Sequence, residues 1–338
     1  MLNLAYIDLI KLKENALEVK KHLKPKQLFN AVIKADAYGH GAEKVANALY
    51  TIADNFSVAI VEEGVKLRQA GIDKDILVLT PFFDCDLPSA VFYDLTLTVD
   101  CVKRAIALEK EAERQNRKVK VQIKFNSGMN RFGVDDLREL NVSARFISES
   151  KHLLLDGTFS HFSAPENKKS RIRAENKFLL ANNLIKGYNN KAVCHISASG
   201  GFLVGAKSDM ARIGILLYGY KPFPTKNVSV SPIMKIYAPI VARRIIKGGS
   251  TALYGDKRAK RDTEIELIRY GYADGFFREE ISGQFNNRCM DATAVIGKTN
   301  GELYPVMEDA EALAKKHHTI SYEILTKCAM RAEKIYLY

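Results

Sequence analysis

The feature that most constrains the fold of this chain is the recurrence of short apolar runs that alternate with amphipathic stretches. The runs are rich in β-branched and aromatic residues, which is typical of buried strands, and the stretches between them predict helices. Eight such repeats predict an α/β fold, a TIM (β/α)8 barrel with functional residues at the C-terminal ends of its strands. The predicted strands are Ala31–Lys34, Ser57–Val61, Ile76–Thr80, Leu95–Val99, Val119–Phe125, Gly157–Phe162, Val193–Ser197 and Ile213–Tyr218, and the clearest helices are Glu62–Ala70, Val102–Gln115, Leu137–Glu149 and Glu166–Lys186.

A doubly wound parallel sheet is the alternative, but no GxGxxG follows the first strand. The composition changes after Tyr220, where Lys221–Pro232 carries three prolines and reads as a linker. Beyond the linker we expect a mostly β domain, because helix is sparse and strand-like runs are joined by glycine-rich turns. Its predicted elements are the strands Met234–Ile246, Thr263–Arg269 and Ala292–Ile296 and the helix Glu308–Lys316.

Composition excludes several function classes. The 338 residues are 47% hydrophobic and 27% charged, which predicts a sizeable core rather than disorder. The net charge of +12 is spread among acidic residues without an RNA-binding pattern, so we expect no nucleic-acid partner. No signal peptide and no membrane-spanning run is visible. The five scattered cysteines have no metal-ligand spacing, which predicts a reducing cytoplasm and no metal site.

The stretch from Ala31 to Gly41 carries the first candidate for chemistry. An apolar run ends at Lys34, and Gly39 and Gly41 then mark a turn into a helix near Ala42. A lysine at the end of a buried strand, beside a polar loop, has a lowered pKa because burial disfavours its charged form. Such an amine forms Schiff bases with aldehydes. The alternative is a surface lysine that merely follows a short strand.

Lys34 to Gly41, Lys-Ala-Asp-Ala-Tyr-Gly-His-Gly, resembles the pyridoxal-phosphate-binding sequence of alanine racemases. The resemblance implies that Lys34 holds pyridoxal 5'-phosphate covalently and that Tyr38 hydrogen-bonds its phosphate. It also implies that the N-terminal strand joins the C-terminal domain. We therefore expect a barrel over residues 8–224, and a mostly β domain made of 1–7 and 225–338 that contributes a tyrosine to the partner's active site.

Lys124 to Gly133 is similar to a second family pattern, with Ser127 where threonine is usual. The planar donors of Arg131 suit a substrate carboxylate. The family implies that role for Arg131 and a carbamylated lysine at Lys124, whose negative charge would pair with the arginine. The alternative is a strand-ending lysine beside a surface arginine.

Two further strand ends match the family. The resemblance implies that His161 packs on the cofactor ring, although a lone histidine at a strand end is more often structural. Ser199 matches the phosphate-binding serine, whereas His195 is interpreted as structural. The Arg212-Ile213-Gly214-Ile215 sequence resembles a motif in which the arginine faces the pyridine nitrogen. The backbone amides of Gly214 and Ile215 are then implied to bind the phosphate.

The second domain carries four more matches. The resemblance implies that Tyr254 is the second acid/base, that Tyr272 lies at the substrate entryway, and that the Met290 amide touches the substrate carboxylate. Tyr322 is implied to reach the phosphate. Each could be an ordinary strand tyrosine or methionine, but they share one order along the chain.

The sequence thus predicts a pyridoxal-phosphate-dependent alanine racemase that interconverts L- and D-alanine with two bases, Lys34 and Tyr254. The family implies a homodimer and the supply of D-alanine for peptidoglycan. A barrel-fold amino-acid decarboxylase, a racemase of broader specificity and a non-catalytic carrier of the cofactor are the alternatives. The polar segment Gly297–His318 departs from the family.

Overall fold

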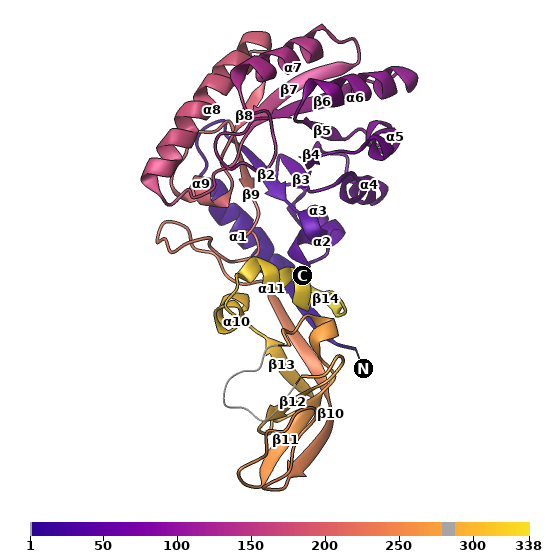
Figure 1. Cartoon of the computed structure of the whole chain (residues 1–338), viewed down its shortest axis with the longest axis vertical. Coiled ribbons are helices and arrows are strands. Elements are labelled where there is room, and N and C mark those ends of the chain that lie inside the picture. Colours follow the sequence, from indigo (N-terminus) through magenta and orange to yellow (C-terminus); the bar gives the residue numbers. More distant parts are fainter. Residues whose placement is uncertain (1, 279–287) are drawn as a thin grey trace. The chain divides into compact units, whose positions relative to one another are not determined.

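The computed structural model describes residues 2–278 and 288–338. The chain forms two compact units (Figure 1). The barrel unit comprises Leu12–Ala37 and Ala42–Ser231, and the β unit comprises the residues up to Lys11, Tyr38–Gly41 and Pro232–Tyr338. Each unit is described by itself below.

The core of the barrel unit is an eight-stranded parallel sheet in the order β8-β7-β6-β5-β4-β3-β2-β9. Backbone hydrogen bonds close it, from Asp209 N to Cys194 O and from Arg212 N to Ser197 O, both 3.0 Å. The predicted (β/α)8 barrel is therefore confirmed, and the doubly wound alternative is wrong. The strands are β2 (Leu28–Val32), β3 (Asn55–Val58), β4 (Ile76–Pro81), β5 (Thr96–Val99), β6 (Val119–Lys124), β7 (Leu153–Phe159), β8 (Val193–His195) and β9 (Met210–Ile213).

Four of the predicted strands were placed too far along the chain, and β3, which ends at Val58 and not at the predicted Val61, is one of them. β2 and β9 end before the predicted Lys34 and Tyr218, and β7 ends before Phe162. Residues 214–218 are buried and form turns, and apolar composition alone does not separate a buried turn from a strand. The true starts were missed because polar side chains such as Asn30 and Asp156 lie inside these strands.

Helices follow most strands along the chain, and Figure 1 shows helices around the outside of the sheet. α7 is representative, since Leu140, Ala144 and Ile147 are buried at helical spacing, and Asp136 caps it by accepting from Glu139 N at 2.8 Å. Burial of a leucine or isoleucine contributes about 1.5–3 kcal/mol. The helices are α1 (Leu9–Lys21), α2 (Lys34–Tyr38), α3 (Ala42–Leu49), α4 (Val61–Gln69), α5 (Leu87–Phe92), α6 (Val102–Arg114), α7 (Leu137–Glu149), α8 (Lys168–Tyr188) and α9 (Ser199–Leu203). In the described part of the chain, no helix has the length and apolarity to cross a membrane.

The interior of the barrel is unusually polar. On β6 the side chains of Lys120, Gln122 and Lys124 share one face, because alternate strand residues point the same way. On β2, Asn30 donates to Asn55 Oδ1 at 2.6 Å. Barrel interiors are usually filled by branched apolar side chains. The polar layers therefore need hydrogen-bond partners across strands, and these cross-strand bonds position the site described below.

The β unit contains a sheet in the order β12-β11-β10-β1-β14, with β13 also paired to β10. The N-terminal strand β1 (Leu4–Asp8) pairs with both β10 and β14, as the resemblance implied. The predicted strand Met234–Ile246 is β10, and the predicted helix Glu308–Lys316 is α10. Strands β13 and β14 and helix α11 were not predicted from the sequence. The other elements are β11 (Thr263–Ile268), β12 (Thr293–Ile296), β13 (Leu303–Met307), α10 (Ala310–Lys316), α11 (Ser321–Cys328) and β14 (Glu333–Leu337).

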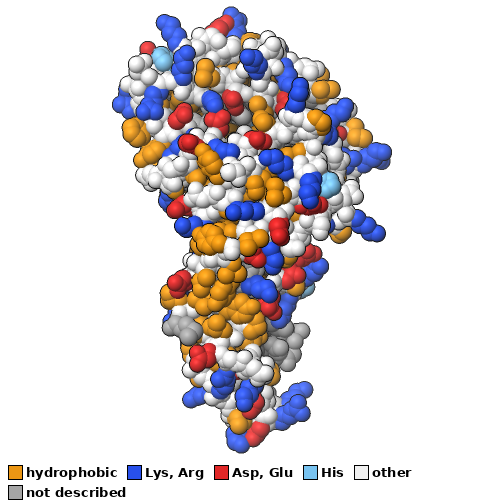
Figure 2. All heavy atoms as spheres, turned by 180° about the vertical axis from the view of Figure 1, so that it is seen from behind, with side chains coloured by type: hydrophobic (Ala, Val, Ile, Leu, Met, Phe, Trp, Pro, Cys, Tyr) orange, Lys and Arg blue, Asp and Glu red, His pale blue; other side chains and the backbone are white. Residues whose placement is uncertain are grey.

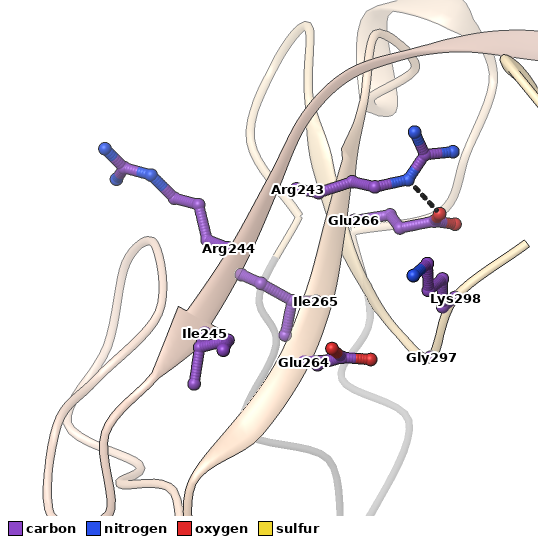
Figure 3. A pocket seen from close by; sticks show the side chains of 8 residues that line it. All are labelled: Arg243, Arg244, Ile245, Glu264, Ile265, Glu266, Gly297 and Lys298. Carbon is purple, nitrogen blue, oxygen red and sulfur yellow. Dashed lines mark hydrogen bonds and ion pairs between the residues drawn. The ribbon is translucent and has the colours of Figure 1, made fainter.

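A small pocket on β10 and β11 surrounds a buried carboxylate (Figure 3). Glu266 accepts from Arg243 Nε at 2.9 Å, and from the backbone N and Oγ1 of Thr299 at 3.0 and 2.9 Å. These donors satisfy the buried charge, so the group has a structural explanation. None of the sequence-predicted site residues lines this pocket.

Candidate active site

Lys34 lies just beyond β2, at the start of a left-handed turn. Ala35, Asp36 and Ala37 have φ of 51°, 52° and 53°, a conformation that costs roughly 1–2 kcal/mol per residue. Glu63 holds this turn, because its Oε1 accepts from Ala35 N at 2.6 Å and its Oε2 from Ala59 N at 2.7 Å. Strained backbone of this kind concentrates at functional sites.

The Lys34 side chain is half-buried in the barrel unit. Burial, the Arg131 charge and the Arg212 charge lower the pKa of its amine, and Glu63 opposes them only in part. Among the described residues, none accepts a hydrogen bond from Nζ of Lys34. The lowered pKa raises the share of the neutral amine, which is the form that acts as a nucleophile or base.

Lys124 is a second cation of this site and is only 4% exposed. Its Nζ lies 4.4 Å from the ring centroid of Phe159 and 5.9 Å from that of Phe132. Arg131 shares the second ring, with Cζ 4.8 Å from its centroid, and its own side chain is exposed. Burial, Arg212 and Arg131 together hold the pKa of Lys124 well below its usual range.

Arg212, on β9, is held by acceptors on both terminal nitrogens. Nη1 donates to His195 Nδ1 and to His195 O at 3.2 Å, while Nη2 donates to Ser160 O at 2.7 Å. His161 Nδ1 lies 3.4 Å from Nη2. Burial and the Arg131 charge lower the pKa of Arg212 to about 9, which still leaves it charged at neutral pH. Among the described residues Nε has no acceptor, so this N–H is available to a ligand.

The segments after β8 and β9 form a buried polar pair. Gly214 N donates to Ser199 Oγ at 3.1 Å, and both residues are buried. The backbone N–H of Ile215, also buried, has no acceptor within the described parts of the chain. A buried N–H without a partner is rare and points to a missing acceptor such as a phosphate oxygen.

Tyr38 and Tyr322 meet in the β unit, with ring centroids 5.9 Å apart. Burial raises the pKa of both hydroxyls, to about 12 for Tyr322, so they remain neutral donors. The chain reaches this arrangement through Gly39 and Gly41, which have φ of 84° and 90°. A Cβ on Gly39 would lie 2.5 Å from the carbonyl oxygen of Leu325, so a side chain cannot be accommodated there.

Tyr272 and Met290 are adjacent in the β unit, whereas Tyr254 lies elsewhere. The carbonyl of Met290 accepts from Ala273 N at 2.9 Å, next to Tyr272. Tyr254 belongs to the loop between β10 and β11, and its side chain is 74% exposed. A tyrosine so exposed on a single chain contributes little to that chain's own core.

The donor set of the barrel unit fits an anionic ligand. Arg131 and Arg212 lower the pKa values of Lys34 and Lys124, and Arg131 also lowers that of Arg212, so the charges that act on Lys124 are both cations. Cations and free N–H groups of this kind suit phosphate and carboxylate oxygens. Pyridoxal 5'-phosphate with an amino-acid substrate carries both groups, so the residues present fit them. In the described residues, no group of His, Cys, Asp and Glu could hold a metal ion.

Sequence reasoning left out two groups that contact this site. His195 was interpreted as structural, yet it binds Arg212 directly and stacks on Phe159 at 5.2 Å between centroids. Gln122 was not singled out, yet it contacts His195. Alternation along β6 could have placed Gln122 on the same face as Lys124, but nothing in the sequence pairs it with residue 195.

The fold and the site define the class of the protein: a two-unit (β/α)8-barrel enzyme with a lysine of lowered pKa just beyond its first barrel strand. The N-terminal domain model of the alanine racemases matches residues 7–222, and the C-terminal domain model matches 233–336. The chain belongs to the alanine racemase family.

Comparison with individual proteins of this family gives the same result. The chain is 32% identical to alanine racemase of Clostridium kluyveri, over 98% of this chain and 93% of the relative. It is 31% identical to alanine racemase 1 of Caldanaerobacter subterraneus subsp. tengcongensis, over 98% and 94%. The solved structure of alanine racemase from Clostridium difficile 630 is similar, with a TM-score of 0.92 and 27% identity over 100% of this chain and 96% of that one.

Proposed function

We propose that this chain interconverts L-alanine and D-alanine with pyridoxal 5'-phosphate as cofactor. The observation that carries the proposal is the half-buried Lys34 amine, with its lowered pKa, beside the cations Lys124, Arg131 and Arg212, for which the described residues supply no ion-pair partner. The names of the relatives support the substrate. When bound, the cofactor withdraws electrons from the α-carbon of the amino acid, which makes its α-proton acidic.

Lys34 would hold the cofactor through Nζ and would move the α-proton on one face. Inversion needs a second base on the other face, because one side chain reaches only one side of a planar carbon. Tyr254 Oη is our candidate. Its exposure of 74% supports a role at a subunit interface, where a second copy would bury it. We therefore propose a homodimer in which each subunit supplies Tyr254 to its partner.

The surface of the β unit also supports a dimer. Figure 2 shows hydrophobic side chains gathered on one face of this unit, whereas lysine and arginine side chains are scattered over the barrel unit. An apolar groove is lined by residues that include Tyr6, Ile233, Tyr237 and Leu303. Exposed apolar patches of this kind often mark protein interfaces.

Arg212 would donate to the ring nitrogen of the cofactor through its free Nε–H. An arginine keeps its proton near neutrality, so the ring nitrogen would stay unprotonated. The ring then withdraws electrons less strongly, which disfavours side reactions such as transamination. His161 would pack on the ring, in keeping with its place 3.4 Å from Arg212 Nη2.

The remaining residues would bind anionic groups. Arg131 and the Met290 amide would hold the substrate carboxylate, and Tyr272 would line the entry. A neutral Lys124 amine can add CO2 and release one proton, which yields a carbamate anion able to pair with Arg131. The phosphate would be bound by Tyr38, Ser199, Gly214, Ile215 and Tyr322.

The proposal extends to organisation and role in the cell. We propose the functional division into residues 8–224 and residues 1–7 with 225–338. A cytoplasmic location is supported by five cysteines that are all free thiols. In that setting the product D-alanine would supply peptidoglycan synthesis.

One incubation tests the function. Purified protein with pyridoxal 5'-phosphate and L-alanine in deuterated water should yield D-alanine that carries deuterium at the α-carbon. Ethylamine would instead identify a decarboxylase. If neither D-alanine nor ethylamine forms, the protein would be a non-catalytic carrier of the cofactor. A parallel incubation with L-serine measures substrate breadth.

A further inference from the structure

A buried chain of hydrogen bonds leads from Arg212 across the barrel to an acidic residue on β7. Arg212 Nη1 donates to His195 Nδ1, and His195 Nε2 lies 2.7 Å from Gln122 Oε1. Gln122 Nε2 in turn donates to Asp156 Oδ2 at 2.7 Å. The first three side chains are at most 4% exposed, and the four come from strands β9, β8, β6 and β7.

The two ends of this chain fix its direction. A guanidinium only donates and an ionised carboxylate only accepts. Between them, His195 must be the neutral imidazole with its proton on Nε2, and Gln122 must turn its oxygen toward the imidazole. Burial and the Arg212 charge hold the pKa of His195 well below its usual range, which agrees with a neutral ring. Each group therefore has one orientation in which all its bonds are made.

We propose that Gln122, oriented by Asp156, is a positioning residue that acts through His195 on Arg212. The imidazole has few other restraints, since Phe159 stacks on its face at 4° and does not fix rotation in the ring plane. Gln122 supplies the in-plane restraint. His195 then holds Nη1, and this bond helps to fix the orientation of the guanidinium and therefore of its Nε–H. The consequence for catalysis rests on the proposed function, in which this N–H meets the cofactor ring.

Asp156 is available for this task because its neighbours are otherwise paired. Lys120 lies two residues before Gln122, on the same face of β6. Its Nζ donates to the two carboxylate oxygens of Asp75 at 2.7 and 2.8 Å. Burial raises the pKa of the Asp156 carboxyl, and the negative charge of Asp75 adds to this rise, whereas the bond from Gln122 and the Lys120 charge oppose it. Asp75 therefore offers a matched control, being a carboxylate of the same region that makes no bond to Gln122.

The experiment compares four variants of the full chain, and a fifth, His195→Asn, serves only to assign a signal. Gln122→Met keeps the side-chain length but leaves His195 Nε2–H without an acceptor. Gln122→Glu places two carboxylates in contact, and the double variant Gln122→Glu/Asp156→Asn restores an acceptor toward His195 and a donor from position 156. Asp75→Asn is the control. Circular dichroism checks that each variant folds.

The first measurement needs neither cofactor nor activity. In cofactor-free protein labelled with 15N-histidine, the His195 Nε2–H proton, assigned by its loss in His195→Asn, should exchange slowly with water. It should exchange faster in Gln122→Met and remain slow in Asp75→Asn. An unchanged signal in Gln122→Met overturns the proposal, whatever the enzyme catalyses.

The second measurement is racemisation by the loaded enzyme. Gln122→Met should lower kcat about tenfold with little change in KM, because one oriented hydrogen bond is lost and the substrate contacts remain. Gln122→Glu should lose more, and the double variant should recover most of that loss. Wild-type kcat in Gln122→Met, or a double variant no better than Gln122→Glu, contradicts the positioning role. A wild-type protein that fails to racemise alanine refutes the proposed function and leaves the exchange result to decide the proposal.

Discussion

Replacing Lys124 with methionine should stabilise the cofactor-free protein. Lys124 is 4% exposed, and the charges that act on it are those of Arg212 and Arg131. A buried charge without a partner costs about 3–5 kcal/mol, and the faces of the two phenylalanines return about 2 kcal/mol when the cation is desolvated. Methionine keeps the length and apolar packing of the side chain. We expect a gain of about 1–3 kcal/mol in the free energy of unfolding.

The sign of the pH dependence follows from the lowered pKa. In the unfolded chain Lys124 is protonated below its ordinary pKa of 10.5, whereas in the fold it protonates only below a much lower pKa. As the pH falls from 10.5 toward that lower pKa, the wild type therefore loses stability, and below it the full cost is present. The advantage of Lys124→Met should therefore grow as the pH falls from 10.5 toward the lowered pKa, and it should shrink as the pH rises toward 10.5.

The assay is urea unfolding followed by circular dichroism in CO2-free buffer, with hydrogen exchange of the β6 amides to report on the barrel unit alone. A bicarbonate arm tests the proposed carbamate. If CO2 adds to Lys124 in the folded protein only, bicarbonate stabilises the wild type and not the variant. A variant that is less stable than the wild type in CO2-free buffer, with an unchanged denaturant slope, would refute the reasoning.

Four further predictions concern the site and the barrel. Lys34→Ala should abolish the absorbance of bound cofactor, and borohydride reduction of the wild type should label the peptide that contains Lys34. Arg131→Lys should raise KM and lower kcat, because a bidentate donor is lost; an unchanged KM would argue against a role in carboxylate binding. Tyr254→Phe should lower racemisation on the order of 10²–10⁴-fold while D-alanine still exchanges its α-proton, and a mixture with Lys34→Ala should regain activity if the tyrosine acts across a dimer. Gly157→Ala should destabilise the barrel by about 1–3 kcal/mol, since its Cβ would lie 2.1 Å from Val193 O, whereas Gly187→Ala in α8 meets nothing within 4 Å and should be neutral or stabilising in the same unfolding assay.

The sequence by itself was enough to predict the barrel and to single out Lys34 as a candidate for chemistry. The period of apolar residues reports which side chains each element buries, so alternating strands and helices could be read without knowing their neighbours. β10 was predicted with its observed limits, and α7 likewise. Lys34 was recognisable because the octapeptide after an apolar run is local information.

Only the tertiary structure decided the backbone around Lys34. Local propensity argues against a left-handed turn of alanine and aspartate, since Cβ crowds the following carbonyl. The turn exists because Glu63, 28 residues away from Ala35, accepts its N–H. The same lack of distant information explains the strand ends that were misplaced at β2, β3, β7 and β9.

The polar network behind Arg212 was equally out of reach of the sequence. Its bonds join residues 17, 73 and 34 positions apart, namely Arg212 to His195, His195 to Gln122, and Gln122 to Asp156. Composition and periodicity describe each strand separately. A glutamine inside a strand therefore only interrupts an apolar run and does not indicate which residue of another strand it contacts. Closure of the barrel brings the four strands together, and buried donors and acceptors must then pair with one another because water is absent.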